Sequence, residues 1–260
     1  MAAAFVFCLL CSAALHAEQW NKTYALTGKP TLHVNTDDAD VRIHSCDCKQ
    51  VQARVEWDGY KPGQVQVTES QSGDAIDLRV RAHDSHIGIN FQWRHQWVRV
   101  DISVPKEADV DAHTGDGHMD LEDVKGDLEL RSGDGKIKVS GVDGMLRAHT
   151  GDGSAKLSGR FDVLDVTTSD GAVDIEVKDG SVIRSGWEIQ SGDGAVHVRL
   201  PANFAADLRA KTGDGSIHTE FPVTITGDLK DRNRMEGKLN GGGGVLTIRT
   251  GDGDVYLEKM

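Results

Sequence analysis

Apolar and polar residues alternate along most of this chain, in short runs that meet at one recurring four-residue pattern. Apolar residues stand two and four positions before a Thr or Ser, as with Leu128 and Leu130 before Ser132. A second alternating pair follows most copies of the pattern, as with Ile137 and Val139. Period-two alternation over five or six residues is typical of a strand with one buried face. The sequence therefore predicts repeated units of strand, turn, strand and turn.

The recurring pattern reads Thr or Ser, Gly, Asp, Gly, and one copy has Ser in place of the first Gly. Its acidic residues are Asp116, Asp134, Asp152, Asp170, Asp193, Asp214 and Asp252. The first three steps between these residues are 18 residues long, and the later steps are 23, 21 and 38 residues. Fixed-period self-similarity of this size is typical of stacked repeat proteins. We therefore predict an all-β fold, a β-helix-like β-solenoid with coils of roughly 18–23 residues and Thr/Ser-Gly-Asp-Gly turns.

The four-residue pattern suits a sharp turn. Glycine adopts positive φ without steric cost, and Asp accepts hydrogen bonds from nearby backbone N–H groups. The Thr or Ser shares its parity with the inward apolar residues, which predicts a ladder of hydroxyl groups that bond one another between coils. An antiparallel meander with Gly-Asp hairpin turns is the alternative architecture, because it also alternates strand and turn.

The repeat extends in weaker form toward the N-terminus. Residues 32–43 follow the same template with Gly replaced. Pro105 ends a strand of alternating Val and Ile residues, and the regular coils start after it. We therefore expect a leader segment at 18–30, a degenerate N-terminal β-repeat region at 31–106 and regular β-solenoid repeats at 107–260.

Residues 1–17 form an apolar run that ends in small residues, which is typical of a secretory signal peptide. A short membrane anchor is the alternative, but the run is shorter than the ~20 residues that span a bilayer. No other stretch of the sequence is apolar enough to cross a membrane. We therefore expect an exported protein without a transmembrane segment in the mature chain, located in the periplasm, at the cell surface or outside the cell.

Two cysteines, Cys46 and Cys48, lie beyond the expected signal peptide. In an oxidising compartment they can form a tight disulfide, whose small loop adds little stability, or remain free thiols. A metal site that adds His44 and His33 to the two cysteines is the alternative.

Two segments fit no repeat. Residues 83–97 concentrate aromatic and His residues, including Phe91, Trp93 and Trp97. This aromatic insert is either a cap over the open end or side of the array, which solenoids need, or a recognition loop that contacts a partner. The second segment, 221–244, contains a run of four Gly residues without the strand and helix of a phosphate-binding loop. We expect it to be a mobile surface loop.

The formal net charge of −12 argues against a nucleic-acid partner, because phosphate binding needs a basic face. Coils stacked in register place the seven turn Asp residues in a column at a spacing of about 4.8 Å. Like charges at that spacing repel by on the order of 1 kcal/mol per pair even in water. Backbone N–H groups offset this repulsion if Asp stabilises the turn, and calcium between coils is the alternative. The nonapeptide of calcium-binding β-rolls is absent from the sequence.

We predict that the protein is not an enzyme and needs no cofactor. A β-helix glycosidase or polysaccharide lyase with paired carboxylates is the enzymatic alternative. Catalytic acids are usually singular, whereas the turn Asp residues all occupy one equivalent position. The sequence also shows no Ser/His/Asp arrangement and no His-Glu-x-x-His motif.

Three features together resemble the bacterial DUF4097 family of β-strand-repeat proteins, which are described as candidate adhesins. These features are the tandem turns between alternating strands, the Val104–Pro105 pair before them and the closing run from Leu246 to Gly253. The resemblance covers about residues 31–260. It implies a β-helix-like solenoid on an exported protein and brings no catalytic residues with it.

These observations predict a non-catalytic interaction module of the cell envelope or cell surface. Rows of polar residues on its long sides suit a repetitive partner such as an envelope polymer. The alternative is an envelope scaffold or sensor-accessory protein that binds a surface protein through the aromatic insert. If the protein binds through its rows of polar residues, loss of Trp93 and Trp97 should leave binding intact. If it binds through the aromatic insert, the same loss should abolish binding.

Overall fold

The structure, a computed structural model, describes residues 18–83, 96–225 and 233–260. In this part of the chain every regular element is a β-strand, and 21 strands form one continuous hydrogen-bonded sheet. The strands are β1 (Glu18–Ala25), β2 (Thr31–Thr36), β3 (Asp40–Cys46), β4 (Gln50–Asp58), β5 (Val65–Ser72), β6 (Ala75–Ala82), β7 (Trp97–Pro105), β8 (Asp109–Thr114), β9 (Met119–Glu122), β10 (Lys125–Ser132), β11 (Ile137–Thr150), β12 (Ala155–Thr168), β13 (Val173–Val177), β14 (Trp187–Ser191), β15 (Val196–Leu200), β16 (Ala206–Lys211), β17 (Ile217–Thr219), β18 (Val223–Ile225), β19 (Arg234–Leu239), β20 (Val245–Thr250) and β21 (Val255–Lys259).

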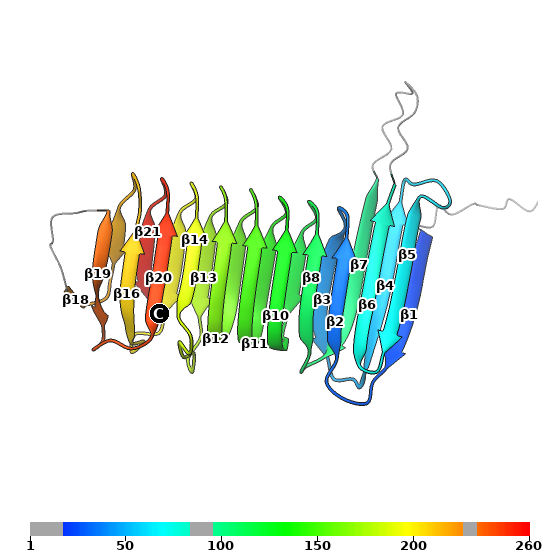
Figure 1. The fold of residues 1–260 in the computed structure, drawn as a ribbon, viewed down its shortest axis with the longest axis horizontal. Coiled ribbons are helices and arrows are strands. Elements are labelled where there is room, and N and C mark those ends of the chain that lie inside the picture. The colour runs from blue at the N-terminus through cyan, green and yellow to red at the C-terminus, as the bar shows by residue number, and fades with distance from the viewer. Residues whose placement is uncertain (1–17, 84–95, 226–232) are drawn as a thin grey trace, which may run out of the picture.

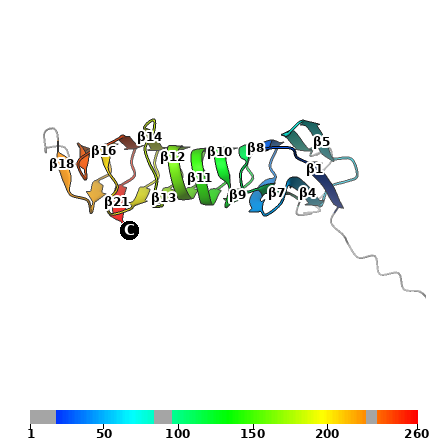
Figure 2. The ribbon, with the colours of Figure 1, turned by 90° about the horizontal axis from the view of Figure 1, so that it is seen from below.

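The sheet folds back on itself into two layers, which Figure 2 shows from below. Layer 1 contains, in spatial order, β5, β6, β2, β8, β10, β11, β12, β14, β20, β16, β19 and β18. Layer 2 contains β1, β4, β7, β3, β9, β11, β12, β13, β15, β21 and β17. Strands of successive coils are parallel, and antiparallel pairs occur only toward the two ends among the described strands. The fold is therefore all-β and solenoid-like, and the meander alternative is wrong.

Two long edges join the layers. At the turn edge, layer-1 strands pass into layer 2 through the four-residue pattern, as at Ser132 to Gly135 between β10 and β11. At the return edge, the chain passes back into layer 1 of the next coil, and β11 and β12 run through this bend without interruption. Gly141 adopts a φ of +67° within the bend of β11, a conformation that glycine takes without strain.

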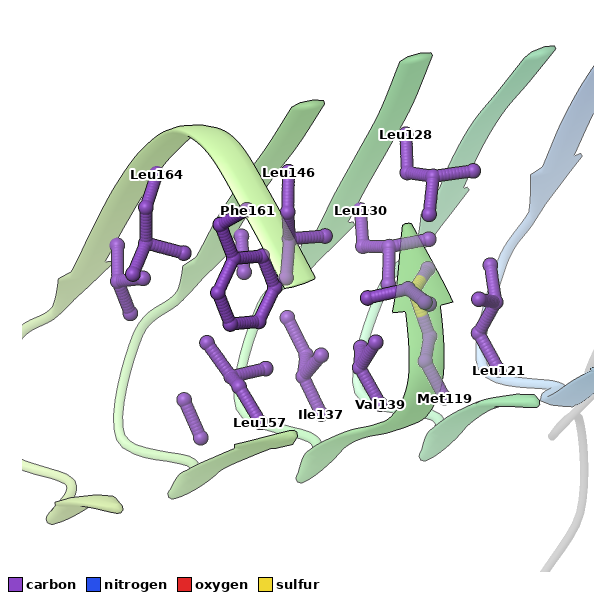
Figure 3. Close-up of a cluster of buried hydrophobic side chains, with 14 of the residues drawn as sticks. Met119, Leu121, Leu128, Leu130, Ile137, Val139, Leu146, Leu157, Phe161 and Leu164 are labelled. Atoms are coloured by element: carbon purple, nitrogen blue, oxygen red, sulfur yellow. The ribbon is translucent and has the colours of Figure 1, made fainter. Parts of the chain in front are cut away.

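The core lies between the two layers, where the predicted inward residues meet (Figure 3). Leu128, Leu130 and Leu146 from layer 1 face Ile137 and Val139 from layer 2, and all five are buried. Burying each such side chain contributes about 1.5–3 kcal/mol. Because every coil repeats these positions, the core is one continuous column along the whole stack.

The turn hydroxyl groups are also buried, but the predicted ladder of hydroxyl-to-hydroxyl bonds is wrong. Ser132 Oγ donates to the carbonyl oxygen of Gly117 in the neighbouring coil at 2.9 Å and accepts the N–H of Gly135 at 3.0 Å. Thr150 Oγ1 donates in the same way to the carbonyl oxygen of Gly135 at 2.7 Å. Backbone N–H and C=O groups in the turn have no partner in the hydrogen-bond ladder between strands. Buried backbone groups need a hydrogen-bond partner, and the turn hydroxyl groups provide it. Ser132 and Thr150 therefore link neighbouring turns through their backbones, whereas Thr168 Oγ1 donates to the carbonyl oxygen of Gly171 in its own turn at 2.6 Å.

The order of coils in the stack differs from their order in the sequence at both ends (Figure 1). The coil of β20 and β21 lies between the coil of β14 and β15 and the coil of β16 and β17. The coil of β2 and β3 likewise lies between β6–β7 and β8–β9. These insertions depend on long-range pairing, which the local repeat does not encode.

The ends of the stack carry strands in segments that the sequence analysis expected to be a surface loop or a leader segment. The expected loop at 221–244 is wrong in its described part, because β18 and β19 form an antiparallel pair that continues layer 1 beyond β16. Leu239 is fully buried, and Met235 is partly buried against the core. At the opposite end, Lys22 of β1 and Glu69 of β5 form an ion pair of 3.1 Å between the outermost strands of the two layers.

Candidate binding surfaces

The seven turn Asp residues lie at the turn edge, and all of their side chains are exposed. The carboxylate of Asp38, in the degenerate first turn, accepts the N–H of Asp116 in the next coil at 3.2 Å. Within the described residues, no group of three or more His, Cys, Asp or Glu side chains is placed to hold a metal ion. Calcium between the coils at the seven turn Asp residues stays the alternative to a turn-stabilising role.

Cys46 and Cys48 are joined by a disulfide, and their Cα atoms are 5.3 Å apart. His44 Nε2 lies 2.8 Å from Ser103 Oγ on the outer face of layer 2. His33 lies on the outer face of layer 1, with Nδ1 3.6 Å from a carboxylate oxygen of Asp111. The structure thus places the two histidines on opposite faces of the solenoid.

The aromatic insert takes the place of a turn in its coil, because β6 ends layer 1 at Ala82 and β7 begins layer 2 at Trp97. Phe91 and Trp93 lie outside the described residues. Trp97 is half-buried, and the guanidinium carbon of Arg99 lies 5.4 Å from its ring centroid, a cation–π distance. The insert is therefore attached at the same edge as the turn Asp residues.

The outer face of layer 2 pairs its charges along the stack. Arg42 contacts Glu122 of the next strand at 3.4 Å, and Lys138 contacts Asp120 at 3.3 Å. Farther along, Arg199 contacts Asp174 at 2.7 Å. Opposite charges on neighbouring strands stabilise a sheet, so these pairs support the stacking of the coils.

Three aromatic rings replace the charges at the C-terminal end of layer 2. The ring of Tyr256 stacks on His197 at 4.5 Å on one side and on His218 at 5.0 Å on the other. Asp254 accepts a hydrogen bond from the Tyr256 hydroxyl at 3.2 Å, and this hydrogen bond raises the pKa of Tyr256. Sequence reasoning missed this ladder because its strands come from coils that are not consecutive in the sequence.

The outer face of layer 1 carries a row of side chains that stand just before the turn edge. This turn-side row consists, in spatial order, of Arg79, Asn35, His113, Arg131, His149, Thr167, Gln190, Arg249, Lys211 and Arg234. The row spans ten neighbouring strands and contains no carboxylate, in a chain whose formal net charge is −12. A second row, two residues farther from the turn, holds most of the acidic side chains of this face, among them Asp77, Asp111, Glu129, Asp165 and Glu188.

A groove of about 340 Å³ lies between these two rows near the N-terminal end. It crosses β6, β2, β8 and β10, and Val34 and Leu78 belong to its lining. Its polar lining comes from both rows and comprises Arg79, Asn35, His113, Arg131, Asp77, His33 and Asp111. Sequence reasoning missed the groove because its residues meet only through cross-strand register.

Parallel two-layer coils around one continuous core define an all-β, solenoid-like protein with exposed polar faces. The family model Toastrack DUF4097 matches residues 30–258, and the chain belongs to this family. No curated protein sequence matches the chain. No helix of the described residues is long and apolar enough to cross a membrane.

Several solved structures are similar to the chain. A candidate cell adhesion protein from Clostridium sporogenes has 14% sequence identity and a TM-score of 0.44, over 94% of this chain and 100% of that one. A candidate adhesin from Bacteroides fragilis has 10% identity and a TM-score of 0.37, over 94% and 97%. A candidate lipid binding protein from Parabacteroides distasonis has 11% identity and a TM-score of 0.39, over 92% and 96%.

Proposed function

We propose that this protein is an exported, non-catalytic interaction module of the cell envelope or cell surface, which acts like an adhesin by holding a repetitive partner. The observation that carries the proposal is the turn-side row, where ten strands present polar side chains in register. A polymer with a regular repeat can make the same contact on strand after strand. The absence of carboxylates from the row leaves a path along the face for an uncharged or anionic chain.

The repeat length supports this role because it sets the regularity of the row. Ser132 pairs with Thr150, and Thr150 pairs with Thr168, so that equivalent residues 18 positions apart lie side by side. The next coil extends the step to 23 residues, from Thr168 to Ser191, without loss of register in layer 1. Coils of roughly 18–23 residues with Thr/Ser-Gly-Asp-Gly turns thus keep the rows aligned at the strand spacing of about 4.8 Å.

A non-catalytic role agrees with the placement of the acidic residues. The turn Asp side chains occupy one equivalent, exposed position in successive coils, as expected of structural residues. Many acidic side chains of the outer faces are engaged in ion pairs with neighbouring strands.

Co-sedimentation of the purified protein with isolated bacterial envelope fractions tests the proposal, in calcium and in chelator. We expect saturable binding that Thr167→Glu weakens, because this change puts a carboxylate into the turn-side row. Ser158→Glu adds the same charge to the outer face of layer 2 and is the matched control. Calcium dependence would support a cation site at the turn Asp residues, and absence of binding in both conditions would contradict the proposal.

An envelope scaffold or sensor-accessory protein is the second candidate function. The observation that favours it is the aromatic insert, which replaces a turn and is attached beside the groove of layer 1. The double variant Trp93→Ala, Trp97→Ala distinguishes the two functions in a pull-down from solubilised envelope proteins. Loss of a specific protein partner with unchanged polymer binding supports the scaffold role, and unchanged recovery of envelope proteins argues against it.

A further inference from the structure

We propose that the groove on layer 1 binds one acidic sugar unit of the hexuronate class within an envelope polymer. This inference rests on the proposed function, because it names the chemistry of the partner at one place on the turn-side row. The groove brings polar side chains of the two rows together in one hollow of layer 1.

Four polar side chains of the groove have no partner in the described part of the chain. Asn35, Asp77, Arg79 and His113 make no side-chain hydrogen bond or ion pair with any described residue. Farther along the same face, Arg249 pairs with Glu188 at 2.6 Å. Arg147, His149, Asp165 and Thr167, farther along this face, also have no side-chain partner among the described residues. What distinguishes the groove is that its unpaired Arg79 and Asp77 line one hollow.

The four side chains differ in what they offer to a ligand. The guanidinium of Arg79 presents paired N–H donors that match the geometry of a carboxylate. The Asn35 amide and the His113 ring, on the next two strands of the same row, add further polar contacts. Asp77 lies in the second row, two residues from Arg79, and its carboxylate only accepts hydrogen bonds when ionised. A ligand that satisfies all four must bring both an anionic acceptor and hydroxyl donors.

A hexuronate unit has this combination, because one pyranose ring carries a carboxylate and several hydroxyl groups. A phosphodiester linkage offers an anion without hydroxyl donors on the same group and leaves Asp77 unsatisfied. A neutral sugar leaves Arg79 without a charged partner. The pair Arg79 and Asp77 therefore selects an acidic sugar over both alternatives.

The groove suits a unit within a polymer. It crosses four strands, which is about 14 Å at the usual strand spacing, and it is open toward solvent. Arg131 closes its polar lining on β10 and is already oriented by Asp111 at 3.4 Å and by Glu129. Beyond Arg131 the turn-side row continues with His149 and Thr167, so a bound chain meets no carboxylate as it leaves the groove along this row.

The test is calorimetric titration of the purified protein with oligogalacturonate, for the wild type, Arg79→Gln and the control Arg209→Gln. Arg209 is exposed on the same face, toward the other end of the stack, and has no side-chain partner among the described residues. A charge-assisted hydrogen bond contributes enough for its loss to weaken binding about tenfold or more. We expect that loss for Arg79→Gln, less than about twofold for Arg209→Gln, and unchanged thermal unfolding of both.

Two further probes fix the ligand class. Oligomaltoside lacks the carboxylate, and inorganic polyphosphate lacks the sugar hydroxyls; we expect weaker binding of both than of oligogalacturonate. Equal binding of polyphosphate, equal losses in the two Arg variants, or no binding of oligogalacturonate to the wild type would overturn the assignment. If envelope co-sedimentation persists in any of these cases, the proposed function stands and only the sugar assignment fails.

Discussion

The turn edge and the outer face of layer 1 both repeat polar residues in register, but they treat those residues in opposite ways. At the turn edge, Ser132 and Thr150 are buried, and their hydroxyl groups donate hydrogen bonds to the backbone of neighbouring turns. On the outer face, Asn35 and Arg79 leave theirs unused within the described chain. The same kind of repetition therefore stabilises the stack in one place and stays available to a partner in the other.

This difference follows from burial. A buried polar atom without a hydrogen bond costs about 1–3 kcal/mol, and the hydroxyl groups of the seven regular turns all donate to backbone carbonyl oxygens. An exposed side chain stays hydrated at little cost and is free to exchange water for a ligand. Substitutions at the turn edge should consequently change folding stability, whereas substitutions on the outer face should change binding.

The largest effect is expected for Gly135→Ala. A Cβ atom at this position would collide with the carbonyl oxygen of Gly117 in the adjacent coil, which belongs to rigid backbone. We expect the free energy of unfolding to fall by about 3 kcal/mol, at the upper end for an overpacked site. Urea unfolding measures this loss. Asp134→Ala, at the exposed neighbouring turn position, is the control and should cost less than about 1 kcal/mol; similar midpoints for the two variants would break the comparison.

A smaller loss is expected for Ser132→Ala. The change removes the donor to the Gly117 carbonyl and the acceptor of the Gly135 N–H, which leaves two buried backbone groups unpaired. We expect a cost of about 1–3 kcal/mol. Ser140→Ala is the matched control, because Ser140 is half-exposed on layer 2 and makes no side-chain hydrogen bond among the described residues. Equal unfolding curves for the two variants would show that the hydrogen bonds of the Ser132 hydroxyl do not contribute to folding stability.

The smallest effect is expected at a hydrated ion pair of the return edge. Arg160 donates to Asp162 at 2.7 Å, and this hydrogen bond together with the positive charge of Arg160 lowers the pKa of Asp162. A lowered folded-state pKa gives stability that is present above the unfolded value of about 4 and is lost as the pH falls through the folded value. Solvent screening limits the contribution to less than about 1 kcal/mol.

Urea unfolding at pH 6 and pH 3 measures that contribution. We expect Asp162→Asn to lose less stability between these two pH values than the wild type, because it lacks the titrating carboxylate. If Asp162→Asn and the wild type show the same pH dependence, the ion pair contributes nothing to the free energy of unfolding. A difference of several kcal/mol would mean that it contributes as much as the buried hydroxyl groups of the turn edge.

The sequence predicts the regular part of the fold well, because each coil repeats the same local pattern. The inward positions Leu128 and Leu130, and Ile137 and Val139 after the turn, are all buried as their alternation indicates. The prediction that the turn hydroxyl groups bond one another was wrong. Periodicity shows that Ser132 points inward, but not which atom of the neighbouring coil its hydroxyl group bonds.

The ends of the stack and the groove were beyond sequence reasoning for a different physical reason. The strand β20 pairs with β14 and β16, and no local signal distinguishes this insertion from stacking in sequence order. The groove depends on the same kind of information, because Arg79 and His113 become neighbours of Asn35 only after β2 has inserted between β6 and β8.

The insertion of β20 and β21 has a consequence for how the protein is made. Synthesis proceeds from the N-terminus, so β16 and β17 leave the ribosome before the strands that join them to β14 and β15 exist. The chain therefore cannot add its coils one by one in the order of translation. Residues 206–211 can pair with β19 before β20 is made, but they join the rest of the stack only through β20. The last coil to be translated therefore completes the attachment of its predecessor.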